Sequence, residues 1–464
     1  MKKTFKIYLN KNKKINKKVN IFILIKLIIN KMIILHNCKK IVTQNENRDI
    51  LENYDIIIEN NVIKSIQKSK NILTKTNQND TIIDCSEKIV MPGLVNMHTH
   101  LPMTFLKGYS DDKELSEWLE KDIWPMEATM TDEDIKNSTI LALKELLLTG
   151  TTTFVDMYSH LESMVEAIKE IPLRSFLSYG VIEGNISYNK EENKTNWIDF
   201  DKTKTEIEGV KKSIELYEKI KKSNLPIKIL IAPHSTYTVK SSTLKELKKI
   251  ANENNLKYLL HVNETRNEFY NIKKHYNKSP VEYLNDLNVL DKNSILVHNV
   301  WATKMELDIL KNTKSHLVFC ATSNAKLASG SVFPFKETQN RNINITIGTD
   351  GSSSNNSLDM FQEMKFSSLL IKNHLWDPTV ASAQEILDCA TINGAIALDE
   401  KIGSIKENYL ADLITLDAND VSLQPKKNNI ISHIVYSINS YATQDVIING
   451  QLILNNRKII KKHD

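Results

Sequence analysis

Short runs of alternating apolar and polar residues occupy both ends of the chain, with turn-forming residues between them. Such runs are typical of β-strands with one buried face. Neither end can close a core alone, so we expect one small β-sandwich domain built from residues 32–88 and 402–464. The Asn449-Gly450 pair predicts a tight hairpin turn between the last two strands. The predicted strands are Met32–Leu35, Tyr54–Glu59, Val62–Ile66, Thr81–Asp84, Asp412–Leu416, Ile431–Tyr436, Gln444–Asn449 and Gln451–Leu454.

Between these ends, apolar runs alternate with amphipathic stretches of helical period, which is the pattern of a parallel sheet with helical crossovers. Eight such runs predict an α/β fold, a (β/α)8 TIM-like barrel over residues 89–401. An open, doubly wound sheet is the alternative, but no GxGxxG motif opens a helix here. The predicted strands are Ile89–His98, Thr151–Met157, Leu173–Ile182, Ile227–Pro233, Lys257–Val262, Ser294–Val300, Ser315–Cys320 and Ile343–Asp350. The predicted helices include Thr131–Thr149, Lys202–Lys221, Ser241–Asn254 and Pro280–Leu287.

Residues 1–31 carry ten lysines and no acidic residue, which more than accounts for the net charge of +5. The rest of the chain is therefore net negative, and its composition indicates no basic face for a nucleic acid. The apolar stretch Val19–Ile29 is interrupted by Asn20 and Lys26 and is shorter than the about 20 residues that a membrane helix needs. No small-residue cleavage site follows it. We expect a basic extension, with Met32 as the alternative translation start, and no membrane partner.

Four cysteines, Cys38, Cys85, Cys320 and Cys389, lie far apart and form no CxxC pair. This spacing argues against a zinc ribbon and against a dense disulfide framework. The contents of hydrophobic residues, 41%, and of charged residues, 25%, are ordinary for a globular protein. We therefore expect a globular protein of the reducing cytoplasm.

Histidines gather where the predicted strands end. His98 and His100 are two residues apart on a strand, so both side chains project to the same side and can hold one ion together. The other strand ends carry His234, His261, His298 and Asp350. Active-site residues of a (β/α)8 barrel gather at this end of the strands. The distribution therefore predicts one metal site at this rim.

Zinc takes nitrogen and oxygen ligands, and a catalytic zinc keeps one position open for water. We choose as ligands His98, His100, His261 and Asp350. A bound metal lowers the pKa of water from about 15.7 to around 7. Glu264 follows His261 by three residues, so it can reach the same cavity and act as a proton shuttle without binding the ion. His298 can orient or deprotonate the water, and Asp350 can serve as both ligand and base.

The motifs around these residues resemble the metal-dependent amidohydrolase superfamily. Within it they are most similar to the methylthioadenosine/S-adenosylhomocysteine deaminases, including the 5′-deoxyadenosine deaminases. The likeness runs from about Met32 to the C-terminus, and the motifs follow one another in order at strand ends. They are Pro92–His100, Pro233–Thr238, His261–Thr265, His298–Trp301, Ser323–Gly330 and Gly348–Asn356.

The resemblance implies one zinc per subunit on the four ligands, with Fe²⁺ as the alternative metal, and hydrolytic replacement of the adenine 6-amino group by oxygen. Glu264 would then protonate ring N1, while His298 and Asp350 would hold and activate the attacking hydroxide. Glu127 falls where the family has the glutamate that binds the ribose hydroxyls, and His234 matches its substrate-contacting histidine. Glu264 and Asp350 would also contact the substrate. The expected partners are an adenine nucleoside and further copies of this chain in a homo-oligomer.

Two positions depart from the family pattern. The Asn-Pro that usually precedes Ser-Asn after the seventh strand is Ala321-Thr322 here. Members that act on S-adenosylhomocysteine can carry arginines after the third strand for its carboxylate, whereas this chain has Tyr179 there and no arginine from 175 to 265. Lysine cannot form the same bidentate pair. We therefore expect small 5′-substituents, as in 5′-deoxyadenosine or 5′-methylthioadenosine, to be preferred over the amino-acid conjugate.

Two alternatives stay open. Another mononuclear amidohydrolase, such as a guanine or cytosine deaminase or a triazine chlorohydrolase, would use the same kind of metal site. Binuclear relatives usually bridge two metals with a modified lysine at the end of strand four, where this chain has Ala232-Pro233-His234. A non-catalytic barrel scaffold would be expected to have lost ligands, and this chain has kept all of them.

Overall fold

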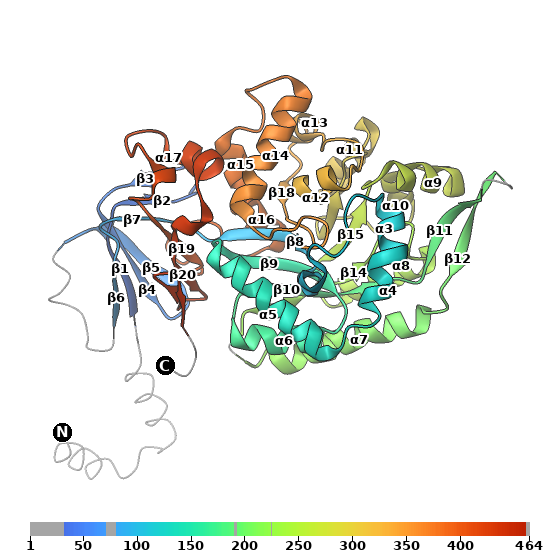
Figure 1. Cartoon of the computed structure of the whole chain (residues 1–464), viewed down its shortest axis with the longest axis horizontal. Helices are drawn as coiled ribbons and strands as arrows, with labels where there is room; N and C mark the ends of the chain where they lie inside the picture. Colours follow the sequence, from blue (N-terminus) through green and yellow to red (C-terminus); the bar gives the residue numbers. More distant parts are fainter. Residues whose placement is uncertain (1–31, 71–79, 190–192, 224, 461–464) are drawn as a thin grey trace, which may run out of the picture.

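The computed structural model describes residues 32–70, 80–189, 193–223 and 225–460. The predicted basic extension, residues 1–31, lies outside these ranges. Figure 1 shows a group of β-strands at one end of the molecule, to which both ends of the chain contribute, beside a larger part in which strands and helices alternate. Within the described ranges, we find no helix that is both long and apolar enough to cross a membrane.

Parallel strands form the centre of the larger part. Their bounds are β8 (Leu94–Thr99), β9 (Thr151–Tyr158), β10 (Arg174–Val181), β13 (Ile227–Ile229), β14 (Ala232–Pro233), β15 (Tyr258–Val262), β16 (Ser294–His298), β17 (His316–Phe319) and β18 (Ile345–Ile347). They belong to two sheets, one with the order β13-β10-β9-β8 and β14 paired to β10, the other with the order β15-β16-β17-β18. Almost every residue of these strands is buried, because helices cover them.

The two parallel sheets meet along two seams. At one seam, isolated parallel bridges, including Ser235 with His261, join the sheets. At the other, the N–H of Asp350 donates to the carbonyl oxygen of His98 at 2.9 Å. The fold is therefore mixed α/β with parallel strands that meet edge to edge at both seams, while the strand ladder itself is not continuous around them.

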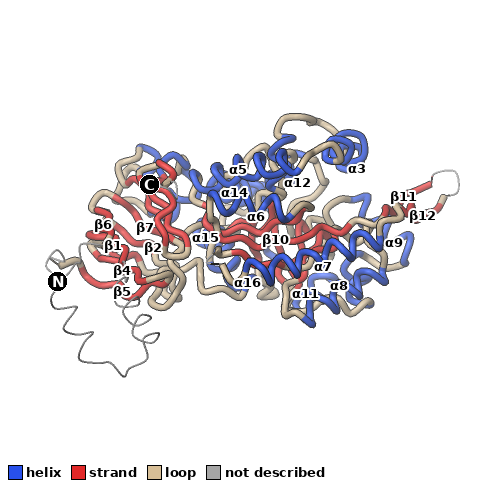
Figure 2. The backbone as a smooth tube through the Cα atoms, turned by 90° about the horizontal axis from the view of Figure 1, so that it is seen from below, coloured by secondary structure: helices blue, strands red, loops and turns tan. Residues whose placement is uncertain are grey.

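Helices lie on both sides of these strands (Figure 2). The four predicted helices are confirmed with ends that shift by at most one residue. Two of them have a side-chain signal at the start: Thr131 accepts a hydrogen bond from the backbone of Asp134 at the start of α5, and Glu282 accepts one from the N–H of Ser279 before α10. The helix bounds are α5 (Asp132–Leu148), α6 (Leu161–Glu170), α7 (Thr203–Ile220), α8 (Ser241–Glu253), α9 (Arg266–Tyr276), α10 (Pro280–Asp286), α11 (Lys304–Thr313), α12 (Ala321–Lys326), α13 (Phe335–Gln339), α14 (Met360–Leu375), α15 (Ala383–Cys389) and α16 (Ile392–Leu398).

Two insertions border the strand ends and were not predicted. A chain of short helices follows β8, and a two-stranded antiparallel hairpin follows β10 and projects from the molecule (Figure 1). The short helices pack through a small apolar cluster of their own that includes Trp118 and Ile123. Their bounds are η2 (Leu101–Leu106), α3 (Leu115–Trp118), η3 (Leu119–Ile123) and α4 (Trp124–Glu127), and those of the hairpin are β11 (Gly184–Asn189) and β12 (Lys194–Asp199).

The remaining strands, from both ends of the chain, form two further sheets, and strands of the two ends pair in the larger one. The bounds are β1 (Met32–Cys38), β2 (Lys40–Val42), β3 (Ile50–Leu51), β4 (Tyr54–Glu59), β5 (Val62–Lys68), β6 (Thr81–Asp84), β7 (Lys88–Pro92), β19 (Leu413–Asp417), β20 (Thr443–Ile448), β21 (Gln451–Asn455) and β22 (Lys458–Ile459). One sheet has the order β5-β4-β1-β6, the other the order β22-β21-β20-β19-β7-β2-β3. Both sheets contribute to one apolar cluster, which includes Ile56, Val90 and Leu413. The predicted Asn449-Gly450 turn is confirmed, with φ of 50° and 70°.

Two strand predictions were wrong. Residues 431–436 are helical, in α17 (Ile430–Ser432) and a following π-helical turn, η5 (His433–Ser437), because the Asn429 side chain caps the backbone N–H groups of Ile431 and Ser432. The run Ile89–His98 is two strands, β7 and β8, that enter different sheets on either side of Gly93. A Cβ at Gly93 would lie 2.1 Å from Thr152, so the chain changes sheets where only glycine fits. Two short 3₁₀ turns, η4 (Val421–Leu423) and η6 (Ser440–Ala442), flank the helical segment.

Candidate active site

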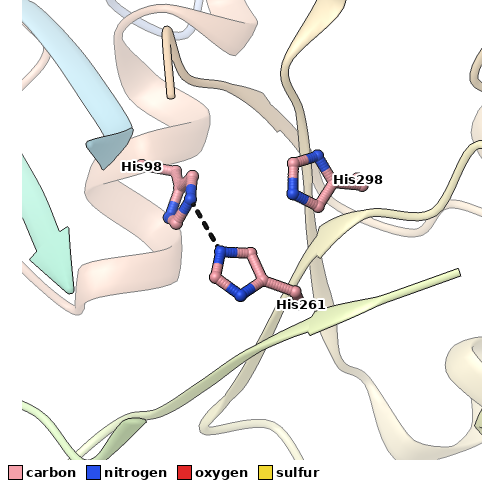
Figure 3. A group of neighbouring side chains, drawn as sticks. All are labelled: His98, His261 and His298. Atoms are coloured by element: carbon pink, nitrogen blue, oxygen red, sulfur yellow. Dashed lines mark hydrogen bonds between the residues drawn. The ribbon is translucent and has the colours of Figure 1, made fainter. Parts of the chain in front are cut away.

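The structure brings the predicted rim residues together at the C-terminal ends of the parallel strands. His98 lies in β8, His261 in β15 and His298 ends β16, while His100 and Asp350 follow β8 and β18. Figure 3 shows His98 and His261 pointing toward each other, with His298 facing the same space from the neighbouring strand. The strand pairing positions these side chains, because β15 and β16 are adjacent and β18 approaches β8.

Neighbouring donor atoms of the four predicted ligands lie close together. Nε2 of His98 lies 3.0 Å from Nε2 of His261 and 3.3 Å from Oδ1 of Asp350, which is also 3.3 Å from Nε2 of His100. Ligands held tetrahedrally at 2.0–2.1 Å from zinc would be separated by about 3.3 Å. These three separations are therefore those of neighbouring ligands around one divalent ion.

Hydrogen bonds fix which ring nitrogen is available on two of the histidines. Nδ1 of His100 lies 2.6 Å from the carbonyl oxygen of Met157, and Nδ1 of His261 lies 2.7 Å from that of His234. A carbonyl only accepts, so each Nδ1–H donates to it and Nε2 is the ring atom left to bind a metal. Imidazole nitrogens with one carboxylate oxygen are ligands that zinc takes, so this donor set fits a metal. Nδ1 of His98 is buried and has no partner among the described residues.

Burial and neighbouring charges shift the pKa values of these four groups in different directions. Burial lowers the pKa of His98 and holds that of His261 well below its ordinary value, which leaves both rings neutral. Burial also acts to lower the pKa of His100, but the hydrogen bond and charge of Asp350 outweigh it and raise this pKa to about 9. Burial acts against ionisation of Asp350, yet the bonds and charges of His100 and His98 hold its pKa well below the usual range. The cluster therefore contains one buried carboxylate among imidazoles.

Two site residues have a backbone conformation that L-residues rarely adopt. His298 has φ of 77° and Asp350 has φ of 65°. Such conformations cost about 1–3 kcal/mol each and persist only when the surroundings impose them. Here the side chains supply that restraint: Nδ1 of His298 lies 3.1 Å from the amide of Asn324, and Ser323 donates to Oδ2 of Asp350 at 2.7 Å. Both partners belong to α12, directly after β17.

Glu264 stands beside the cluster as the sequence predicted. Burial first, then the negative charges of Asp350 and Glu268, raise the pKa of Glu264 well above its ordinary value. The carboxyl group therefore holds its proton to a higher pH than an exposed glutamate does, as suits a proton donor. Its Oε2 lies 3.6 Å from Nε2 of His298, whose own pKa burial lowers to about 3. A carboxyl group with a raised pKa thus lies beside an imidazole with a lowered one.

A cavity of about 450 Å³ opens at this cluster, which is within the range of small-molecule sites. Glu127 and His234 line it together with the rim residues. Tyr158, at the end of β9, donates to Oε1 of Glu127 at 2.7 Å, and burial raises the pKa of Glu127. Burial and the neighbouring histidines lower the pKa of His234 to about 3, so it is a neutral hydrogen-bonding group. Tyr179 lines the same cavity.

Two other groups of side chains at the site, which the sequence did not single out, also bring possible metal-binding atoms together. Donor atoms of His98, His261 and His298 lie within 4.8 Å of one another, and so do those of Glu264, His298 and Asp350. The ligand set therefore stays a prediction.

Sequence reasoning missed Asp156 in β9. Its Oδ2 accepts hydrogen bonds from Thr99 and from the N–H of Leu101, and so fixes the turn that carries His100. Its position at the end of a predicted strand was the signal for it.

A family model for the amidohydrolase family matches residues 89–453, which include every rim residue described above. The chain belongs to the amidohydrolase family. The same family membership indicates that the site holds a divalent metal.

Known relatives extend over nearly the whole chain. It is 39% identical over 409 residues to a 5-methylthioadenosine/S-adenosylhomocysteine deaminase of Thermococcus kodakarensis, which covers 88% of this chain and 91% of that protein. It is 39% identical over 412 residues to a 5′-deoxyadenosine deaminase of Methanosphaera stadtmanae, covering 89% and 92%. A solved adenosine deaminase from Xanthomonas campestris with bound zinc superimposes with a TM-score of 0.83 at 30% identity, covering 93% and 94%. These likenesses confirm the prediction of a hydrolytic deaminase.

Proposed function

We propose that this amidohydrolase is a zinc-dependent deaminase of 5′-modified adenosines, including 5′-deoxyadenosine, 5′-methylthioadenosine and S-adenosylhomocysteine. Water would replace the 6-amino group, giving the inosine analogue and ammonia. The observation that carries the proposal is the buried Glu264, 3.6 Å from His298, beside the facing Nε2 atoms of His98 and His261 and the Asp350 carboxylate that both His98 and His100 approach. The names of relatives at 39% identity support the substrate class.

We infer that the ligands are His98, His100, His261 and Asp350. A zinc ion there would act as a Lewis acid and make a water molecule more acidic, and Fe²⁺ would supply the same chemistry. The 3.0–3.3 Å separations between neighbouring donor atoms support this set. His298 instead points its Nε2 toward Glu264, as expected of a group that handles protons.

In this mechanism the chain's own residues move protons. Glu264 donates its proton to ring N1 of adenine, which makes the neighbouring C6 electrophilic. Asp350, with His298 beside it, accepts one proton of the attacking water and passes it to the departing amino group, which leaves as ammonia. The second proton of that water, on the C6 hydroxyl, returns to Glu264 as the C6 carbonyl forms. Glu127 accepts hydrogen bonds from the ribose hydroxyls, and His234, neutral at physiological pH, contacts the substrate beside them.

We also propose the chain organisation on which this site depends. Residues 89–401 would form the metal-binding (β/α)8 barrel, and residues 32–88 with 402–464 the composite β-sandwich. The edge-to-edge meeting of the parallel sheets at both seams supports the first, and the apolar cluster shared by strands of both chain ends supports the second. We expect a homo-oligomer, and a reducing compartment such as the cytoplasm, which is compatible with four buried, free cysteines.

The test is release of ammonia by the zinc-loaded protein from 5′-deoxyadenosine and 5′-methylthioadenosine. We expect turnover of both, with the hypoxanthine nucleosides as products. Glu264→Gln keeps the size of the side chain but cannot donate the same proton, so we expect kcat to fall by about 10²–10⁴ while the zinc content, measured on the same sample, is retained. A zinc-replete protein that releases no ammonia from any adenine nucleoside would contradict the proposal.

A further inference from the structure

A buried carboxylate that the proposed mechanism does not use lies in the wall of the active-site cavity. Glu206, in the first turns of α7, is 8% exposed and lines the cavity. Its Oε2 accepts one hydrogen bond, from the N–H of Ile182 at 3.2 Å. Burial raises its pKa, which shows how poorly the negative charge is solvated there.

Apolar and aromatic side chains line this cavity together with Glu206. They include Ile182 and Phe200. The ring of Tyr179 packs against Gly209, one helical turn after Glu206, so closely that a Cβ at Gly209 would lie 2.5 Å from the ring. Burial, with the nearby charge of Glu206, raises the pKa of Tyr179 to about 12, so the ring stays a neutral phenol.

The charge of Glu206 has no cationic partner within ion-pair distance among the described residues. Lys202, one turn earlier, is exposed and lines the cavity, and its more distant charge lowers the pKa of Glu206 only partly. The cavity wall formed by β10 and α7 is therefore net negative on its buried side. A carboxylate in such a place attracts a cation and repels an anion more strongly than it would in water.

The proposed function assigns a ligand group to this wall. The reacting base would lie at Glu264 and Asp350, and the ribose at Glu127, which Tyr158 of β9 supports. Tyr179 follows on the adjacent strand, paired in register with Tyr158. With the ribose at Glu127, the 5′-substituent would then lie against the neighbouring wall of the cavity, which Tyr179 and Glu206 form.

We propose, on the basis of this function, that Glu206 makes the cavity select 5′-substituents that carry a positive charge, an ammonium or a sulfonium, over substituents that carry a carboxylate. Small neutral substituents contact only the apolar ring and Ile182, so they are accepted at an intermediate rate. The charge, not the size, of the 5′-group is thus what Glu206 recognises.

The experiment compares three substrates of similar size: 5′-amino-5′-deoxyadenosine, 5′-deoxyadenosine and adenosine 5′-carboxylate. The values of kcat/KM for the zinc-loaded protein are expressed as two ratios, cation to neutral and anion to neutral. In Glu206→Gln we expect the first ratio to fall by about tenfold and the second to rise by about tenfold, as for loss of one charge-assisted contact. Ratios that stay unchanged, or that move in the same direction, would overturn the proposal.

Two further variants make the result specific to charge at this wall. Lys202→Met removes the opposing positive charge from an exposed position that does not endanger folding, so both ratios should move in the sense opposite to Glu206→Gln. Glu208→Gln changes a 59% exposed carboxylate of the same helix, paired with Lys212, and should leave both ratios as they are. If the parent protein deaminates none of the three nucleosides, the proposed function fails instead, and this outcome is distinct from a failure of charge selection.

Discussion

His316 lies at the start of β17, at the opposite end of the strands from the active site, and is buried as a neutral ring. Its Nε2–H donates to the carbonyl oxygen of Lys292 at 3.1 Å, and Nδ1 accepts from the amide of Asn344 at 3.0 Å. Both nitrogens are satisfied only without a second ring proton. Burial, with the charge of Lys257, lowers the pKa of His316 to about 4.

This residue makes the protein sensitive to acid. An unfolded histidine titrates at about 6.5, so between about pH 6.5 and about pH 4 the unfolded chain holds the extra proton, and the free energy of unfolding falls as the pH falls. The shift corresponds to about 3 kcal/mol. In His316→Gln we expect a smaller drop of the thermal midpoint between about pH 7 and about pH 4.5 than in the parent protein. His374→Gln, at an exposed position of α14, is the control, and an equal drop in all three proteins would refute the assignment.

Among the helices, α11 is tied to the active-site loop through its first turn. Thr303 accepts from the N–H of Glu306 at 3.2 Å, and Oε2 of Glu306 accepts from the N–H of Thr303 at 2.8 Å. Oε1 of the same buried glutamate accepts from the amide of Asn263 and from the N–H of Val281. This cap therefore holds the loop between His261 and Glu264 as well as the helix.

Removing this cap should lower the free energy of unfolding by about as much as one N-cap hydrogen bond contributes. In Thr303→Ala we expect the free energy of unfolding, measured with urea, to fall by about 1 kcal/mol. Thr303→Ser retains the hydroxyl and should remain close to the parent protein. A loss of the same size in both variants would indicate that the methyl group, and not the hydrogen bond, carries the effect.

The elements differ in how well the sequence predicts them, and the reason is local. Helices with caps, such as α5 and α10, have a chemical signal at each start and were predicted almost to the residue. The segment 431–436 carries apolar residues at spacings that fit a strand or a helix face, so only the Asn429 cap distinguishes the two. The β11–β12 hairpin and the short helices after β8 lack a sustained period. Their conformations depend on contacts with distant elements.

At the scale of the whole molecule, the rim was predictable because its residues occupy equivalent places in successive repeats. The first, fourth, fifth, sixth and eighth predicted strands end at or near a histidine or aspartate, and the parallel arrangement brings these ends together regardless of sequence separation. Glu206 has no such place. It lies within a helix whose other charged residues are exposed, and only the packing of α7 against β10 directs it to the cavity. The sequence pattern therefore could not predict the part of the cavity wall that we propose recognises the 5′-group.

The parallel strands and the sheets of the chain ends are joined by one buried ion pair. Arg174, the first residue of β10, donates from Nε and Nη2 to Asp412, just before β19, at 2.5 and 3.1 Å. The side chains are 8% and 1% exposed. Asp412 also accepts from the N–H of Asn449, so its carboxylate links three segments from distant parts of the chain. Burial acts to lower the pKa of Arg174, but Asp412 outweighs it and raises that pKa.

Breaking this pair on one side leaves a buried charge without compensation. In Arg174→Met we expect the free energy of unfolding to fall by about 3–5 kcal/mol, because the methionine fills the space but leaves the Asp412 carboxylate desolvated. Combining it with Asp412→Asn removes that charge and should recover part of the loss. Lys136→Met breaks an exposed pair with Glu170 and should cost less than about 1 kcal/mol. If Arg174→Met costs no more than Lys136→Met in urea unfolding, the buried pair does not hold the two parts together.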